Sequence, residues 1–421
     1  MSTRRTFLYT LSAAVPAAVQ TTKDSVRLGF IGSGIRGKQL IDEFMAVPGA
    51  KGIAVADLYD GCQQRAKEQL GDNIQAGRDY RAVLDNKDVD AVVVATPDHW
   101  HERIVLDALS AGKHVYVEKP MTWSIKEGPK IIDAAKRSGK VLQVGSQAKT
   151  SALTAKAKEL IAGGALGKVN MIRMANHRNS PEGAWQYPVP PDASEKTIDW
   201  PTWLGRAPKR AFDPKVVFQW RRFWDFSGGV AADLFVHQFT QMHEIMNVKA
   251  PVSAVSQGRI CKWDDGRTVP DVMNSLVEYQ EGFLVDVYVN QANRQQPRGI
   301  LIFGDQGTLL VEGGRLVLSP EPKAGEAQNY GSINFPRKLR DEYLAKYANE
   351  ARASRPEPKE MPIERNQSHN WFFIDSILNN KPSRENAEEG HYAAAAAHLC
   401  NLAYRHKTRA SWDPATAKVK L

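Results

Sequence analysis

The sequence predicts an α/β protein that begins with a parallel-sheet domain and continues into a second α/β domain. Between residues 26 and 144, short apolar runs alternate with segments of helical periodicity, which is typical of parallel strands joined by helices. Over residues 283–289, apolar and more polar positions alternate, as in a sheet with one covered face. A chain of 421 residues is also long enough to form two domains.

Residues 1–22 are expected to form an export signal. Arg4 and Arg5 stand near the start and are followed by Phe7, Leu8 and an Ala-rich apolar stretch without acidic residues. This arrangement is typical of a twin-arginine signal, and the twin-arginine machinery carries proteins that have already folded. The pattern therefore predicts a periplasmic or otherwise exported protein, and the alternative is a disordered tail.

The first domain, residues 23–147, begins with a strand, a glycine-rich turn and a helix. The apolar run 26–31 precedes the segment 32–37, which reads GSGIRG, and apolar residues at helical spacing follow. In such a unit the glycines allow a tight turn and bring a pyrophosphate close to backbone N–H groups at the helix N-terminus. This context predicts a Rossmann dinucleotide-binding domain.

The choice of dinucleotide follows from the second predicted strand, 52–56. It ends in Asp57, which lies 20 residues past Gly37. A carboxylate there accepts hydrogen bonds from the adenosine ribose and repels a ribose phosphate. NAD is therefore favoured over NADP.

Three further strands, 89–95, 114–117 and 141–144, complete the predicted sheet. Ligands bind at the carboxyl ends of such strands, where this chain reads TPDHWH and EKP. His99 and His101 have no third ligand at a matching spacing, so no metal site is expected. The residues expected to hold the cofactor are Gly32, Ser33, Gly34, Ile35, Arg36, Gly37, Asp57, Thr96, Pro97, His101, Glu118, Lys119 and Gln147.

These stretches resemble the Gfo/Idh/MocA family, which includes glucose–fructose oxidoreductase and inositol dehydrogenase. The matching segments are GFIGSGIRG, DAVVVATPDHWH, AGKHVYVEKP, WRRFWDFSGGVAADLFVHQ and FIDSILNNKPSRENAEEGHYAAAAAHLCNLAYR, which extend over nearly the whole chain after the leader. The resemblance implies a substrate-binding α/β domain over residues 148–421 with a large, open, mostly antiparallel sheet. It also implies homo-oligomers formed through this sheet, and C-terminal helices that pack back on the first domain.

The resemblance further implies a catalytic set. In the family, a lysine from the EKP motif and an Asp-xxx-His helix meet over the nicotinamide, and the corresponding residues here are Lys119, Asp233 and His237. We assign His237 as general base because its ordinary pKa lies near working pH. Lys119 would stabilise developing alkoxide charge, and Asp233 would hold substrate hydroxyls or His237. The chain continues with Gln238 where many members have a second histidine, so the particular sugar stays open.

A sugar would be bound by stacking and hydrogen bonding within the same crevice. The expected substrate-binding residues are Trp100, His177, Trp185, Arg222, Asp233 and His237. The net charge of +9 is scattered rather than gathered into a stripe with interleaved aromatic residues, so no nucleic-acid partner is expected.

Three functions fit these observations. The first is a sugar or polyol oxidoreductase that uses tightly held NAD. The second is a glycosidase that oxidises its substrate, eliminates, adds water and reduces again on the same NAD. The third is a non-catalytic sugar-binding protein, against which the intact Lys119, Asp233 and His237 argue. Outside the cytoplasm no dinucleotide pool exists, so an exported protein of either enzymatic kind must retain its NAD.

Overall fold

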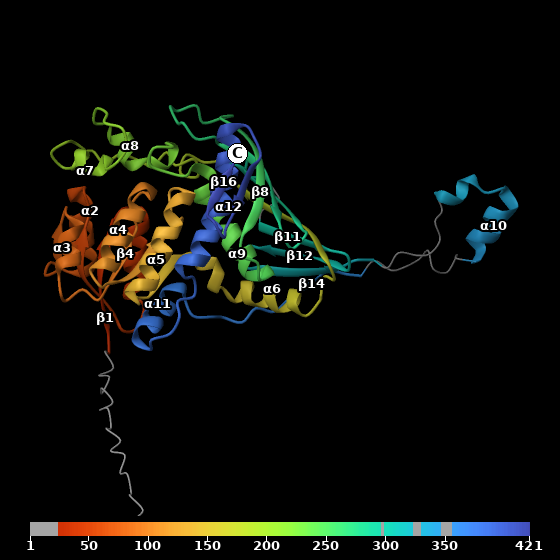
Figure 1. The fold of residues 1–421 in the computed structure, drawn as a ribbon, viewed down its shortest axis with the longest axis horizontal. Coiled ribbons are helices and arrows are strands. Elements are labelled where there is room, and N and C mark those ends of the chain that lie inside the picture. Colours follow the sequence, from red (N-terminus) through yellow and green to blue (C-terminus); the bar gives the residue numbers. More distant parts are fainter. Residues whose placement is uncertain (1–23, 296–298, 323–329, 347–355) are drawn as a thin grey trace, which may run out of the picture.

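The computed structural model describes residues 24–295, 299–322, 330–346 and 356–421, and the predicted signal at residues 1–22 lies outside them. Two α/β domains lie side by side (Figure 1), which confirms the predicted fold class. The first contains a six-stranded parallel sheet in the order β3-β2-β1-β4-β5-β6, the order of a dinucleotide-binding Rossmann domain. Its strands are β1 Val26–Ile31, β2 Ala50–Ala56, β3 Gln75–Gly77, β4 Ala91–Val94, β5 His114–Glu118 and β6 Leu142–Gly145.

Helices cover both faces of this sheet, which is why its central strands are apolar throughout. Val92 and Val93 on β4 point to opposite faces and are both fully buried. On one face Phe44 packs against Phe373 from the C-terminal part of the chain, with ring centroids 6.0 Å apart. The helices of this domain are α1 Ile35–Met45, α2 Asp60–Leu70, α3 Tyr80–Asp85, α4 Asp98–Ser110 and α5 Gly128–Ser138.

The second domain is built on a ten-stranded sheet in the order β14-β13-β12-β11-β7-β10-β9-β8-β15-β16. Every neighbouring pair is antiparallel except β7 and β10. The predicted alternation is real, because Val285, Val287 and Val289 point into the core. The strands are β7 Val169–His177, β8 Pro251–Arg259, β9 Val272–Tyr279, β10 Leu284–Asn290, β11 Gly299–Gly304, β12 Gly307–Glu312, β13 Arg315–Pro320, β14 Lys359–Glu360, β15 Ala410–Asp413 and β16 Lys418–Lys420.

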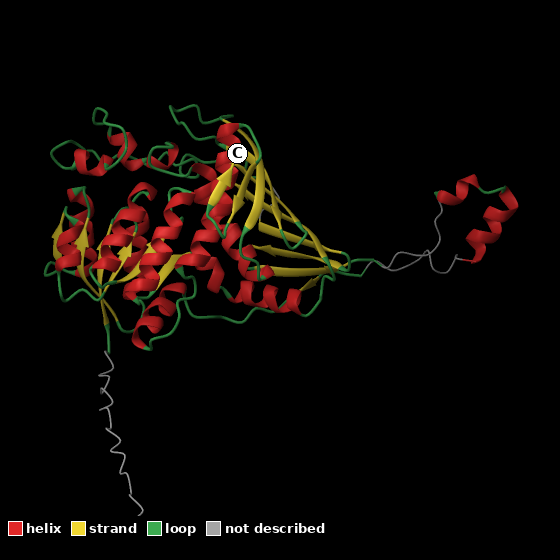
Figure 2. Cartoon of the chain, viewed as in Figure 1, coloured by secondary structure: helices red, strands yellow, loops and turns green. Residues whose placement is uncertain are grey.

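Helices cover one face of this sheet and fill the space between the two domains (Figure 2). No helix within the described ranges has the length and apolar character needed to cross a membrane. The remaining helices are α6 Ala152–Ala162, α7 Trp200–Leu204, α8 Pro214–Phe218, α9 Val236–Met246, α10 Arg337–Lys346, α11 His369–Leu378 and α12 Ala387–His406.

A long connection after β7 reaches over the first domain. We call residues 187–226 the cover. It carries α7 and α8 across the carboxyl edge of the parallel sheet, above α2 and α4 (Figure 1). Backbone hydrogen bonds fix it there, from Asp60 N–H to Thr197 O at 3.0 Å and from Asp199 N–H to Leu58 O at 3.0 Å. The cover therefore closes one side of any ligand site at this edge.

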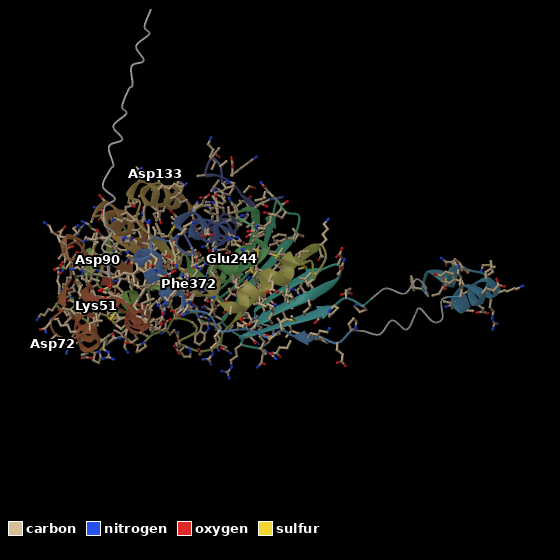
Figure 3. All side chains as sticks on the ribbon, turned by 90° about the horizontal axis from the view of Figure 1, so that it is seen from below. Lys51, Asp72, Asp90, Asp133, Glu244 and Phe372 are labelled. Carbon is tan, nitrogen blue, oxygen red and sulfur yellow. The ribbon has the colours of Figure 1, made fainter. Side chains whose placement is uncertain are left out.

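The domains also meet on the side away from the cover. A cavity of about 570 Å³ lies there, and Glu244 of α9 and Phe372 of α11 line it (Figure 3). Lys149 bridges the elements, with its Nζ 2.8 Å from Glu244 and 3.1 Å from Glu389. Beside this network Glu385 is buried, and burial raises its pKa to about 8.

Candidate active site

The glycine-rich turn leaves room for a ligand at the start of α1. Gly32 has φ +84°, and a Cβ there would lie 2.8 Å from the backbone of Ala95. A Cβ on Gly37 would lie 2.1 Å from the carbonyl oxygen of Gly32, whereas one on Gly34 would meet nothing within 4 Å. Two glycines are thus required by packing, and the third borders open space at a helix N-terminus without a side-chain cap.

Asp57 stands at the end of β2, beside this turn. Its carboxylate accepts hydrogen bonds from the backbone N–H of Ser33 at 2.7 Å and of Tyr59 at 2.9 Å. Burial raises the pKa of Asp57, while these N–H groups oppose the rise. The carboxylate is therefore held in a fixed position where the predicted ribose contact would be made.

A cavity of about 590 Å³ joins these features. It runs from Asp57 past the glycine turn to Thr96 and Pro97 at the end of β4, and it is closed by cover residues that include Trp203. The open space at Gly34 and the fixed carboxylate of Asp57 fit a dinucleotide. The residues that would hold one are thus the predicted turn, Asp57, Thr96 and Pro97.

Other predicted cofactor residues form a network at the end of β5. Arg36 Nε lies 2.8 Å from Glu118 Oε1, and Gln147 Nε2 donates to the same oxygen at 3.3 Å. His101 Nδ1 lies 2.8 Å from the carbonyl oxygen of Pro120, and burial lowers the pKa of this histidine to about 4. A neutral His101 thus positions the turn that carries Lys119, whereas Ile35 stays exposed on the cavity wall.

Lys119 and Asp233 meet across the domain boundary. Lys119 Nζ lies 2.9 Å from Asp233 Oδ1 and donates to Asp233 O at 3.0 Å. Arg221 Nε donates to the same carboxylate oxygen at 3.1 Å. Burial by itself would raise the pKa of Asp233, but the adjacent cations hold it well below its ordinary value. Asp233 is thus an anion clamped between two cations.

His237 lies beyond this pair on the same helical segment. Burial, followed by the charge of Lys119, lowers its pKa to about 3. The imidazole is therefore neutral near pH 7. Its pKa does not lie near working pH, which corrects the reason for assigning it as general base from the sequence. The structure records no hydrogen bond between His237 and Asp233 within the described chain. Residues Ala231–Phe235 form a π-helical turn, which is wider than an α-helical turn. Asp233 and His237, four residues apart, therefore do not lie one above the other on the helix surface as the sequence suggested.

The predicted substrate-binding residues separate into two groups. Trp100 lines the cavity, and its Nε1 donates to Trp203 O at 3.0 Å. His177, at the end of β7, is buried with its ring 5.3 Å from that of Tyr288. Trp185 is fully buried in the core of the second domain, so it does not face the cavity.

Arg222 is also directed away from the cavity. Its guanidinium donates to Asp265 O at 2.8 Å and to Gln219 Oε1, and its side chain is buried. The neighbouring Arg221 is the residue that reaches Asp233 and lines the cavity. The sequence offered two adjacent arginines at residues 221 and 222 and no signal to choose between them.

Asp98 belongs to the same cluster and was missed from the sequence. It is buried at the first turn of α4, and its Oδ2 accepts a hydrogen bond from Gly228 N–H at 3.0 Å, across the domain boundary. Burial raises its pKa to about 7. The signal that could have found it is its place in the strand-end segment 96–101. In the described ranges, no group of three histidine, cysteine or carboxylate side chains is placed to hold a metal ion.

Comparison with solved structures shows the same fold over most of the chain. Levoglucosan dehydrogenase in complex with NADH and levoglucosan has a TM-score of 0.66 at 16% identity, covering 92% of this chain and 99% of that one. Aldose–aldose oxidoreductase from Caulobacter crescentus has 0.66 at 17%, with the same coverage. The WlbA dehydrogenase from Bordetella pertussis, in complex with NADH and UDP-GlcNAcA, has 0.66 at 18%, covering 92% and 98%.

Curated relatives match a shorter part of this chain than the solved structures do. An alpha-N-acetylgalactosaminidase from Shewanella oneidensis is 34% identical over 123 residues, and a glycosyl hydrolase family 109 protein from a Shewanella species is 32% identical over 123 residues. Each match spans 27% of this chain and 27% of the relative, about a quarter of either length.

Two family models cover most of the chain. Residues 26–146 match the NAD-binding Rossmann fold of an oxidoreductase family, and residues 158–411 match the C-terminal alpha/beta domain of the same family. With both of its domains matched in order, the chain belongs to the Gfo/Idh/MocA oxidoreductase family.

Proposed function

We propose that this protein transfers hydride between a carbohydrate hydroxyl and a tightly held NAD. The observation that carries the proposal is the position of Lys119 and Asp233, which meet where the two domains join, beside the dinucleotide-binding edge of the sheet. NAD bound there supplies the hydride acceptor. Sugar-active proteins with the same fold support a carbohydrate or polyol as substrate.

The chain's own groups divide the remaining work. His237, neutral near pH 7, takes the hydroxyl proton. Lys119 donates a hydrogen bond to the reacting oxygen and stabilises the negative charge that develops on it. Asp233 holds the Lys119 ammonium in place through the 2.9 Å contact, and Arg221 restrains Asp233 from the other side.

A second candidate is an NAD-dependent glycosidase, and the curated relatives named as glycosidases favour it. Oxidation at one ring carbon acidifies the neighbouring C–H bond, so elimination, hydration and re-reduction would return the NAD unchanged. The deciding experiment incubates the purified holoprotein with nitrophenyl glycosides and with free sugars, without added cofactor. Release of nitrophenol over many turnovers supports the glycosidase, whereas reduction of bound nicotinamide by free sugar supports the oxidoreductase.

The preference for NAD rests on the surroundings of Asp57. Five arginines line the same cavity, and each is paired with a carboxylate: Arg36 with Glu118 and Glu43, Arg65 with Glu68, Arg78 with Asp60, Arg81 with Asp79, and Arg221 with Asp233. A ribose phosphate would therefore meet the Asp57 carboxylate and no guanidinium without an acidic partner. Direct titration with NAD and NADP tests this preference.

Retention of the cofactor rests on the cover. His99 Nε2 lies 3.1 Å from Trp203 O, and Trp203 stacks on Trp200 with centroids 5.4 Å apart. NAD in the cavity beneath would leave only when these contacts open. Retention is tested by dialysing the protein extensively, denaturing it and measuring the NAD that is released. NAD that is held by the protein remains after the dialysis.

Two further properties belong to this proposal. Val255, Leu276 and Leu284 are 44%, 48% and 55% exposed on β8, β9 and β10, which supports association of copies through this sheet. Leu276→Asp should then lower the mass of the particle in solution, as measured by light scattering.

Export by the twin-arginine machinery to the periplasm rests on Arg4 and Arg5, and replacement of both by Lys should leave the full-length protein in the cytoplasm.

A further inference from the structure

The cluster around Asp233 carries more positive charge than the catalytic pair requires, and its member Arg221 lines the cavity. Lys119, Arg221 and Arg178 all act on Asp233, and the last two come from the second domain. The buried carboxyl groups in this cluster are Asp233 and Asp98, and the exposed Glu182 also acts on the neighbouring Tyr187. Three cations thus face two buried carboxyl groups, and this buried part of the cluster keeps a positive surplus even when both acids are ionised.

Arg221 has donors to spare. Its Nε donates to Asp233, but within the described chain neither of its Nη atoms has a hydrogen-bond partner. The Arg221 Cζ lies over the ring of Trp220, 4.2 Å from its centroid, and this contact restrains the guanidinium. Because Arg221 lines the cavity, its free N–H groups are available to a ligand.

Arg178 is a further cation whose charge acts on Asp233, and within the described residues no carboxylate is hydrogen-bonded to its side chain. Its backbone N–H donates to Asn290 O at 2.9 Å, so the residue is fixed at the end of β7. Its stem runs against Gly183, where an added Cβ would lie 3.0 Å from Arg178 Cβ. Among the described residues, no side chain accepts a hydrogen bond from its guanidinium, although its charge acts on both Asp233 and His237.

Tyr187 completes this face. It lines the cavity, and within the described ranges its hydroxyl has no hydrogen-bond partner. Burial raises its pKa, and Arg221 and Arg178 oppose that rise, so the phenol lies near both guanidinium groups. Two guanidinium groups and a phenol with free donors form a set that matches the oxygens of a planar carboxylate.

We propose that the substrate is an acidic sugar, whose anionic group binds Arg178, Arg221 and Tyr187 while a ring hydroxyl faces Lys119 and His237. This inference rests on the proposed function and narrows its substrate class. A carboxylate or a sulfate ester would supply the same oxygen acceptors. A neutral sugar would cover Arg178 without offering its guanidinium an anionic acceptor.

The experiment uses the holoprotein and matched pairs of probes. Calorimetric titration compares methyl glucuronide with methyl glucoside, methyl galacturonide with methyl galactoside, and galactose 6-sulfate with galactose. We expect the acidic member of at least one pair to bind about ten-fold more tightly or better, with a preference that shrinks as salt is added. The pair with the larger ratio distinguishes a carboxylate from a sulfate.

The variants locate the effect. Arg178→Gln should bring the acid-to-neutral ratio of affinities close to one. Arg178→Lys should keep part of this ratio, because lysine keeps the positive charge but lacks the paired N–H donors of a guanidinium. Arg173→Gln is the matched control, since Arg173 lies on β7, the strand that ends just before Arg178, and pairs with Asp286 at 3.1 Å. It should keep the full ratio.

Equal affinity for both members of every pair, or a ratio unchanged in folded Arg178→Gln, would overturn the inference. Failure of the proposed function has a different signature: acidic sugars bind preferentially, yet no sugar of either kind reduces the bound nicotinamide or is cleaved.

Discussion

Lys119 on the first domain and Asp233 on the second are joined by a buried ion pair, with Nζ 2.9 Å from Oδ1. Both side chains are 10% exposed, so the pair is largely removed from water. Removal of one member of a partly desolvated ion pair destabilises the protein, because the other member is left as a buried charge without a partner. Asp233 keeps a second cation, Arg221, when Lys119 is removed. The arrangement therefore makes Lys119 replaceable without leaving Asp233 unpaired.

The catalytic prediction follows from this asymmetry. Lys119→Ala and His237→Ala should each give a folded protein that still binds NAD and loses rate by about two orders of magnitude or more. Single-turnover reduction of bound nicotinamide measures the rate, and nucleotide release on denaturation measures binding. Near-normal turnover by either variant would contradict the role assigned to that residue.

The cofactor prediction concerns Asp57. Asp57→Ala removes both the ribose acceptor and the charge that repels a phosphate, so the preference for NAD over NADP should fall by about ten-fold or more. Asp72→Ala is the control, because Asp72 is an exposed carboxylate after α2 (Figure 3). Affinities are compared on protein stripped of nucleotide. A wild-type protein that binds both cofactors equally would contradict this assignment.

Local signals in the sequence place several of the residues that are predicted to hold the cofactor. The turn from Gly32 to Gly37 and the place of Asp57 follow from the spacing within one βα unit, and the structure brings them to one cavity. The conformation of this unit depends on neighbours close in the chain. The positions of its functional groups could therefore be predicted before the second domain was placed.

The substrate half depends on contacts that spacing does not encode. Trp185 has a positive φ of 64° and turns into the core, while Arg221 rather than Arg222 reaches Asp233. A π-helical turn changes the relation of Asp233 to His237. Each outcome is decided by how the second domain packs against the first, which neighbouring residues in the sequence do not reveal.

The cover gives a prediction about cofactor release. Arg206 on the cover lies 3.2 Å from Glu102 and also pairs with Glu127, both on the first domain. Arg206→Ala removes these two contacts, and since Arg206 is 45% exposed their combined worth is about 1 kcal/mol. The rate of NAD dissociation should rise about five-fold.

Arg103→Ala is the matched control for the cover. Arg103 also pairs with a carboxylate of α4, Asp107 at 2.8 Å, and both members of this pair lie on the same helix of the first domain. Release is followed by trapping the freed nucleotide with an excess of a second dehydrogenase. If Arg206→Ala and Arg103→Ala release NAD at the wild-type rate, the cover does not limit dissociation.

The last prediction concerns Glu385 at the domain junction. It is 1% exposed, and burial raises its pKa from an ordinary value near 4.5 to about 8 despite the opposing charge of Lys149. Between these values the native state keeps the proton and the unfolded chain has lost it. The free energy of unfolding should therefore fall as pH rises, by about 1.4 kcal/mol per pH unit from this group, and level off above pH 8.

Buried histidines act in the opposite direction, but only below about pH 6.5, where the unfolded imidazole takes up a proton. Asp98, whose pKa burial raises to about 7, adds a decline of the same sign up to about that pH. The Asp98 contribution is the same in the wild type and in Glu385→Gln, so the difference between their curves from pH 6.5 to 8 reports Glu385. Glu385→Gln keeps the shape of the side chain and removes the titration, so its urea midpoint should decline less steeply with pH than that of the wild type, with the two curves diverging toward pH 8. Glu159→Gln, a surface carboxylate paired with Lys156, should follow the wild type. Parallel curves for Glu385→Gln and the wild type across this range would show that Glu385 is already ionised in the folded protein, with Lys149 as its counter-charge.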